Sequence, residues 1–166
     1  EGKRDGLQQL YYEDGQLEYE RYYKMGKLDG NSKDYYEDGQ LEDDSNYKMG
    51  ELDGNSKEYY KDGQLKYDRN YKEGELDGNS KRYYEDGQLQ YDYNYKIFKN
   101  GSGTWYSTEH GIQKEYHQNG QLKSEENYTK GKLDGTYKSF DKKGQLTFEN
   151  TFKMGRMVPG TRKEYY

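Results

Sequence analysis

The chain has 166 residues, of which 28% are hydrophobic and 36% are charged, and its mean hydropathy is -1.66. It contains no cysteine, which excludes a disulfide framework and a cysteine-based metal site. The net charge of -5 argues against nucleic acid as the main partner, because proteins that bind nucleic acid present a basic face.

The position of the aromatic residues argues for an ordered protein, although so polar a composition usually indicates disorder. Aromatic residues make up 17% of the chain, include 23 tyrosines and recur at fixed positions. The absence of alanine and of any long segment with 3.6-residue periodicity argues against helix. We therefore expect a thin, ordered β protein held together mainly by rows of tyrosine.

A motif of seven residues, Tyr-Tyr-Glu-Asp-Gly-Gln-Leu at 35–41, occurs in six copies with variations. The leucines of successive copies are 24, 24, 24, 33 and 24 residues apart, and a fixed period of this size indicates a tandem repeat array. Residues 31–36 and 40–48 are short, rich in tyrosine and bounded by glycine, which is typical of hairpin strands. We expect one continuous array over residues 1–166, with repeats at about 6–29, 30–53, 54–77, 78–97, 111–134 and 135–159, an irregular insertion at 98–110 and a partial strand at 160–166.

The loop at residues 37–39 determines how the two strands of a hairpin align. A two-residue Asp-Gly turn would place Tyr36 opposite Leu41, whereas a three-residue loop would place Tyr35 there. The position of Tyr35 is aromatic in every copy, so we expect the constant aromatic residue to face the constant leucine. The three-residue loop follows, with Gly39 supplying the positive φ that other residues resist.

This register gives the two faces of the sheet different compositions. One face carries Tyr35, Leu41, Tyr47 and their equivalents, so rings form rows in which neighbours can pack at ~0.5–1.5 kcal/mol per pair. We expect the Tyr35 and Tyr47 rows to be the structural core. The other face is polar, and its most regular row is acidic: Glu20, Asp44, Asp68, Asp92, Glu125 and Glu149.

Nine extra residues follow the fourth repeat. Residues 103–108 have the pattern of one added strand between two glycine turns, and they include Trp105, the only tryptophan. A single extra strand would reverse every later strand and move the later Asx-Gly loops to the opposite edge. The alternative is a surface loop between two subarrays.

The two ends of the chain both have the pattern of a repeat. Residues 1–6 match the end of a repeat, so we expect any targeting segment to lie upstream of Glu1. Residues 161–166 match a first strand, and Pro159 suits the start of an edge strand. Uncapped edge strands can pair with other chains, so end-to-end self-association is expected as a hazard or a use.

The unit Gly-x-x-x-x-Tyr-Tyr-Glu-Asp-Gly-Gln-Leu, followed by Tyr-Lys-x-Gly-x-Leu-Asp-Gly, resembles the bacterial variant of the MORN (membrane occupation and recognition nexus) repeat. The resemblance covers essentially the whole chain apart from residues 98–110. It implies an all-β fold, an elongated single-layer antiparallel β-meander of tandem 24-residue hairpins. It also implies protein–protein contact, scaffolding or membrane-lipid association rather than catalysis, and some bacterial members are catalogued as antitoxins.

One position departs from the family's pattern. Bacterial members often have tryptophan two residues after the first glycine of the repeat, where this chain has Ser32, Ser56 and Ser80. The departure implies looser packing on that side. A second resemblance, to cell-wall-binding repeats that hold choline or sugars in aromatic cages, rests only on Gly103-Thr104-Trp105-Tyr106.

Sites for metals, cofactors and catalysis are not indicated. The aspartates of the Asp-Gly loops could form a calcium ladder, but aspartate favours such turns without metal, and no Asp-x-Asp spacing appears. His110 and His117 are the only histidines and have no motif for a nucleophile or metal partner. We expect no catalytic, cofactor-binding or metal-binding residue.

Two sets of residues remain as candidates for binding a partner. A row of lysines could contact anionic lipid or glycan, although their aliphatic stems could equally cover tyrosine rings on a solvated face. The row comprises Lys33, Lys57, Lys81, Lys114, Lys138 and Lys163. Tyrosine offers a large area and a hydroxyl at low entropic cost, so the less regular aromatic residues are the better candidates. They are Tyr12, Tyr36, Tyr60, Tyr84, Tyr22, Tyr93, Trp105 and Tyr106.

The sequence thus predicts a non-catalytic repeat scaffold that binds a protein, at the bacterial cell surface or envelope. An extracytoplasmic location (secreted, periplasmic or outer surface) is favoured. One alternative is attachment to membrane lipid or to cell-wall glycan through lysine and tyrosine rows, and another is an antitoxin-like partner of a toxin protein.

Overall fold

The computed structural model describes residues 2–166. By its internal contacts the chain divides into two compact units, residues 1–75 and 76–166. In both units the described residues form strands and turns, without a helix. Every strand is antiparallel to the strands it pairs with, as tandem hairpins require.

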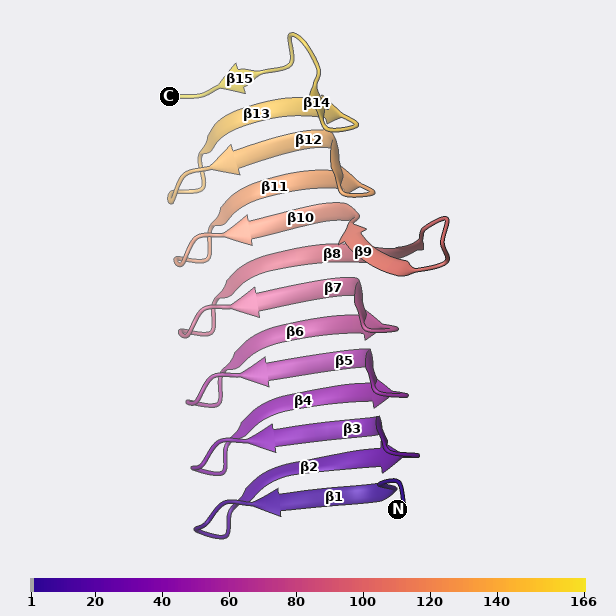
Figure 1. The fold of residues 1–166 in the computed structure, drawn as a ribbon. Helices are drawn as coiled ribbons and strands as arrows, with labels where there is room; N and C mark the ends of the chain where they lie inside the picture. The colour runs from indigo at the N-terminus through magenta and orange to yellow at the C-terminus, as the bar shows by residue number, and fades with distance from the viewer. Residues whose placement is uncertain (1) are drawn as a thin grey trace. The chain divides into compact units, whose positions relative to one another are not determined.

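The first unit contains six strands that pair in chain order. They are β1 (Gly6–Tyr11), β2 (Leu17–Lys24), β3 (Lys27–Tyr35), β4 (Leu41–Lys48), β5 (Glu51–Tyr59) and β6 (Leu65–Lys72). Figure 1 shows them side by side in a single layer, so both faces of the sheet are open to solvent or to a partner.

The second unit contains the remaining strands. They are β7 (Glu75–Tyr83), β8 (Leu89–Lys99), β9 (Trp105–Glu109), β10 (Gly111–Tyr116), β11 (Leu122–Thr129), β12 (Lys132–Phe140), β13 (Leu146–Lys153), β14 (Arg156–Met157) and β15 (Lys163–Glu164). The order is β7-β8-β10-β11-β12-β13-β14, with β9 on β8 and β15 on β13.

The Asx-Gly loops lie along one edge of each unit, which we call the loop edge (Figure 1). Tyr35 is paired with Leu41, which confirms the three-residue loop. The Tyr36 N–H donates to the Gln40 carbonyl at 2.8 Å, and the Gly39 N–H donates to the Tyr36 carbonyl at 2.8 Å. Gly39 has a φ of 81°, the left-handed conformation that the expected loop requires.

The opposite edge, the turn edge, is built from two-residue turns such as Met49-Gly50. Both residues have positive φ, 54° and 92°, as a type I′ turn requires, although methionine resists this conformation. A carboxylate of the preceding repeat holds the turn, because Asp29 Oδ2 accepts the Met49 N–H at 3.1 Å. The Gly50 N–H donates to the Leu28 carbonyl at 2.7 Å. The Leu-Asp-Gly segment therefore links each repeat to the turn of the next by hydrogen bonds, a role that the sequence did not predict.

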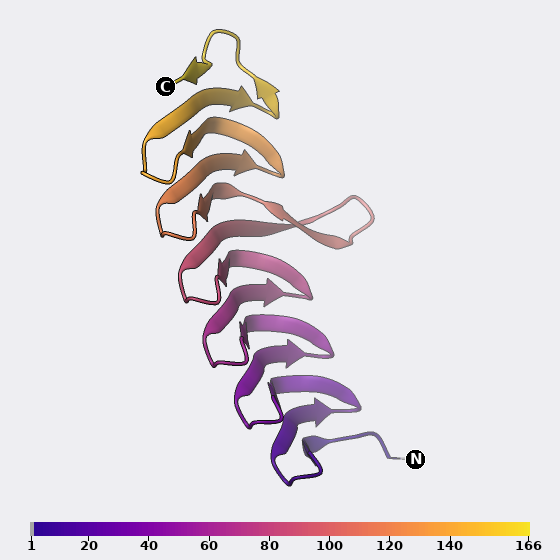
Figure 2. The same ribbon diagram turned by 90° about the vertical axis from the view of Figure 1, so that its left-hand side faces the viewer.

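The insertion forms a strand, but the expected reversal of later strands is wrong. The strand β9 pairs with the outer half of β8 (Tyr95 opposite Glu109), and β10 pairs with the inner half (Asp92 opposite Lys114). The strands β9 and β10 follow one another along the same partner, so the extra residues lengthen one hairpin past the turn edge. Figure 2 shows this hairpin projecting, and Figure 1 shows the later loops still on the loop edge.

The centre of the sheet is more polar than the sequence predicts. No hydrophobic side chain is fully buried among residues 2–166, and the tyrosine rows are only half-buried. Tyr47 lies opposite Leu52, so rings of adjacent repeats alternate with leucine instead of stacking on each other. The buried residues are Ser32, Ser45, Ser56, Ser80, Gln113, Ser124 and Asn150. Ser45 and Ser56 illustrate the packing, with their hydroxyl oxygens 2.9 Å apart.

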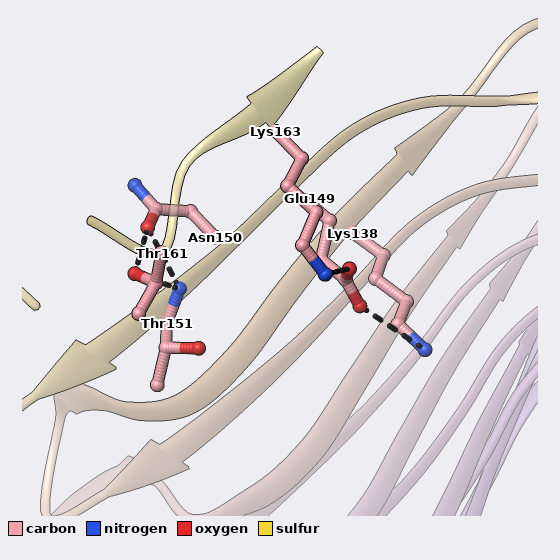
Figure 3. Close-up of polar contacts among 6 residues, drawn as sticks. All are labelled: Lys138, Glu149, Asn150, Thr151, Thr161 and Lys163. Carbon is pink, nitrogen blue, oxygen red and sulfur yellow. Dashed lines mark hydrogen bonds and ion pairs between the residues drawn. The ribbon is translucent and has the colours of Figure 1, made fainter. Parts of the chain in front are cut away.

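The expected final strand is present but short. The strands β14 and β15 both pair with β13, and residues 158–162 bulge between them. Thr161 closes the bulge by donating from Oγ1 to Asn150 Oδ1 at 2.6 Å (Figure 3). Pro159 lies in a turn within the bulge, four residues before β15, so the expectation that it starts the edge strand is wrong.

Candidate functional site

The tyrosines of the loop edge bind the repeat that follows. The Tyr12 hydroxyl donates to the Tyr35 carbonyl at 2.6 Å, and the Tyr36 hydroxyl donates to the Tyr59 carbonyl at 2.8 Å. In the second unit Tyr84 makes the same bond to the Tyr116 carbonyl, at 3.1 Å. His117 replaces tyrosine in the fifth repeat and places Nε2 3.0 Å from the Phe140 carbonyl.

These bonds give the loop-edge tyrosines a structural role without burying them. The rings of Tyr12, Tyr36, Tyr60 and Tyr84 are half-buried, so part of each remains accessible. Partial desolvation, followed by the charge of nearby Glu42, raises the pKa of Tyr36, so its hydroxyl stays protonated and able to donate. The loop-edge tyrosines therefore link successive repeats while part of each ring stays exposed.

The lysine and acidic rows meet in one line of alternating charge. Asp44 lies opposite Lys33 on one side and opposite Lys57 on the other. At the end of the second unit Glu149 has Lys138 at 3.8 Å and Lys163 at 3.1 Å (Figure 3). The lysine row is therefore flanked by carboxylates, which lowers its attraction for an anionic surface.

The hairpin repeat has a match among known families. A family model described as "MORN repeat variant" matches six segments: residues 4–25, 28–49, 52–73, 76–96, 109–130 and 133–154. The chain belongs to the MORN repeat variant family. The membership confirms an all-β, open antiparallel sheet of consecutive hairpins, and the projecting β8–β9 turn lies between two matched segments. None of the curated proteins compared with the chain matches it.

The other candidate tyrosines of this MORN array do not gather with the loop-edge set. Tyr22 is 46% exposed on β2, on the face opposite Arg21. Tyr93 is half-buried, stacks on Tyr91 with ring centroids 4.4 Å apart, and donates its hydroxyl to Glu115 Oε1 at 2.5 Å. Burial and this bond raise the pKa of Tyr93, so it is a packed and protonated residue.

Trp105 and Tyr106 lie on the projecting hairpin. The Tyr106 side chain is 43% exposed, and its ring lies 6.1 Å from that of Phe98. Lys99 Nζ lies 5.0 Å from the Trp105 ring, in the range of a cation–π contact. The structure thus divides the eight predicted contact residues among the loop edge, the sheet faces and this hairpin.

The aspartates of the Asp-Gly loops act as turn caps. Asp38 Oδ1 accepts the Gln40 N–H at 3.1 Å, and Asp14 and Asp62 make the same bond in their own loops at 3.0 Å. Among residues 2–166 no group of three metal-ligating side chains occurs. No helix long and apolar enough to cross a membrane is found in the described part of the chain.

Proposed function

We propose that this MORN array is a non-catalytic scaffold that binds a protein partner at the bacterial envelope, outside the cytoplasm. One observation carries the proposal: the loop-edge tyrosines are fixed by hydrogen bonds to the next repeat while their rings remain half-exposed. A tyrosine that is already ordered loses little conformational entropy when a partner packs against it.

Attachment to lipid through the lysine row is the weaker alternative. A polybasic surface binds anionic lipid at about 1 kcal/mol per basic residue near the surface. Here each lysine of the row lies opposite a carboxylate, as Lys33 lies opposite both Glu20 and Asp44. An antitoxin-like role is a special case of the protein-binding proposal, in which the partner is a toxin.

The test is affinity capture with the whole chain immobilised. Extracts of the producing cell and of likely host cells are passed over it at ~50 and ~200 mM salt, with anionic vesicles in parallel. We expect one protein to be retained at both salt concentrations, because aromatic contacts are insensitive to screening. Retention of vesicles alone, lost at the higher salt, would contradict the protein-binding proposal and favour surface attachment.

A further inference from the structure

The third repeat fills a tyrosine–carboxylate site with a lysine of its own. Lys66 Nζ lies 2.5 Å from Glu58 Oε1 and 5.7 Å from the ring centroids of both Tyr60 and Tyr67. An ammonium within about 6 Å of a ring centroid is attracted by the ring's quadrupole. The hairpin therefore satisfies one cation with one carboxylate and two rings.

The fifth repeat has the same ion pair at the same positions. Lys123 Nζ lies 2.8 Å from Glu115 Oε2, and these residues are eight positions apart, as Glu58 and Lys66 are. The lysine–glutamate pair thus occurs in both units, although His117 and Ser124 take the places of the two tyrosines in the fifth repeat. An ammonium group is the cation that these positions of the hairpin accept.

In the first two repeats the lysine position holds a carboxylate instead. Glu18 and Glu42 occupy the positions of Lys66 and Lys123. Neither side chain forms an ion pair or a hydrogen bond with another of residues 2–166. The glutamate position of the third repeat corresponds to Asp34, whose charge is compensated by Arg21, 2.8 Å away. Two carboxylates are left without a cation.

These carboxylates border a cavity of about 170 Å³ in the first unit. Tyr12 and Tyr19 also line it, and they correspond to the two rings that contact Lys66. The bond from the Tyr12 hydroxyl to the Tyr35 carbonyl fixes the first of these rings. Partial desolvation, and then the charge of Glu18, raises the pKa of Tyr12, so the hydroxyl remains a donor beside the carboxylates.

The charge balance of the cavity favours a cation. Its lining contains Glu18, Asp34 and Glu42 but only one basic residue, Arg21, whose guanidinium lies 4.1 Å from the Tyr19 ring centroid and pairs with Asp34. A compact ammonium with three donors suits carboxylates that approach from two different repeats.

We propose that this cavity binds the ammonium group of a lysine side chain presented by the protein partner. The inference rests on the proposed protein-binding function and deepens it by naming what the first unit recognises. A lysine from outside would place beside Tyr12 and Tyr19 the ammonium group that Lys66 places beside Tyr60 and Tyr67 in the third repeat. Rings on two sides and carboxylates from adjacent repeats would hold it.

The probe is the peptide acetyl-Gly-Gly-Lys-Gly-Gly-amide, titrated into the whole chain with the ring resonances of Tyr12 and Tyr19 followed by NMR. The same peptide with Nε-acetyl-lysine is the neutral control. We expect saturable shifts with the lysine peptide and at least ~10-fold weaker binding of the acetylated one. Equal binding of both peptides, or no saturable shift with the lysine peptide, would overturn the proposal.

Two charge-matched variants separate a built site from general attraction to an acidic protein. E42K places a lysine in the lining of the cavity, so its ammonium group should compete with the peptide for the carboxylates and weaken peptide binding ~10-fold or more. E51K makes the same change of charge at an exposed turn-edge position, where the first and fifth repeats have Lys27 and Lys132. It should change binding less than ~2-fold.

Equal weakening by E42K and E51K would overturn the proposal, because it would indicate attraction by net charge alone. If the spectrum shows that E42K is misfolded, E42Q replaces it and should weaken binding in the same direction. Repeating the affinity capture with E42K then separates the two proposals. A partner retained equally by the original chain and E42K would leave the scaffold function standing and refute the lysine cavity.

Discussion

The two edges of the second unit respond differently to the nine extra residues. At the loop edge Tyr84 still reaches the Tyr116 carbonyl, the bond that Tyr36 makes to Tyr59 in the regular array. At the turn edge the two-residue turn is replaced by a hairpin that ends at residues 100–104. The contacts between repeats are kept on one side and replaced on the other.

The comparison indicates which edge determines the spacing of the repeats. Lys114 lies opposite Asp92 across the insertion, as Lys57 lies opposite Asp44 where there is none. The register of the sheet is therefore independent of the length of the turn-edge connection. We infer that the loop-edge struts and the strand pairing hold the array, and that the turn edge tolerates variation.

The largest expected effect is the loss of a loop-edge strut. Tyr36→Ala removes a half-buried ring and its bond to the Tyr59 carbonyl, and we expect it to lower the free energy of unfolding by about 2–3 kcal/mol. Tyr22→Ala is the control, because the Tyr22 side chain is 46% exposed and makes no hydrogen bond to a described residue. Denaturant unfolding measures both. Equal losses would contradict the strut role.

A smaller loss of stability is expected from a substitution in the loop at residues 37–39. Gly39→Ala forces a residue with a Cβ into a φ of 81°, which costs about 1 kcal/mol. Gly39→Asn should cost less, because asparagine tolerates the left-handed conformation. The order of the two unfolding midpoints is the readout, and an alanine variant as stable as the original would contradict the conformational argument.

The turn edge should gain stability from a change that relieves strain. Met49 has a φ of 54° and a side chain that is 52% exposed, so Met49→Asn should raise stability by about 0.5 kcal/mol. Met49→Ala keeps the unfavourable conformation and should change little. The two variants are compared by thermal unfolding. An asparagine variant no more stable than the alanine variant would contradict the backbone strain at Met49.

The smallest effect is expected where the change in sequence is largest. Replacing residues 97–110 by Met-Gly-Glu-Leu-Asp restores the regular 24-residue spacing. Because β10 already pairs with β8 in the regular register, stability should change by less than about 0.5 kcal/mol. NMR contacts between Asp92 and Lys114 should persist. Their loss would show that the projecting hairpin positions β10.

The repeat, the hairpins and the three-residue loop could be predicted from the sequence, because aromatic residues at the Tyr35 position recur in every copy. The path of the insertion could not, because a spacing of 33 residues fixes a length and leaves the direction of the added strand open. The burial of serine was not predicted either: Ser45 is 2% and Ser56 8% exposed, although hydropathy alone places serine at the surface.

The structural role of the candidate tyrosines could not be predicted from the sequence, because it depends on distances between residues of adjacent repeats. The replacement of tyrosine by His117, another ring that can form a hydrogen bond, was the one signal of a strut in the sequence. The lysine cavity could not be predicted, since Arg21 and Asp34 come from different repeats and their pairing determines which carboxylates remain uncompensated.

Amide hydrogen exchange on the whole chain tests most directly whether the array presents ordered tyrosines. The loop-edge amides of Tyr36 and Gly39, which donate to Gln40 and Tyr36, should exchange more slowly than the turn-edge amides of Met49 and Gly50. Faster exchange at the loop edge would show that it opens first. The tyrosine surface would then not be ordered in advance, and the account of how this scaffold binds its partner would be contradicted.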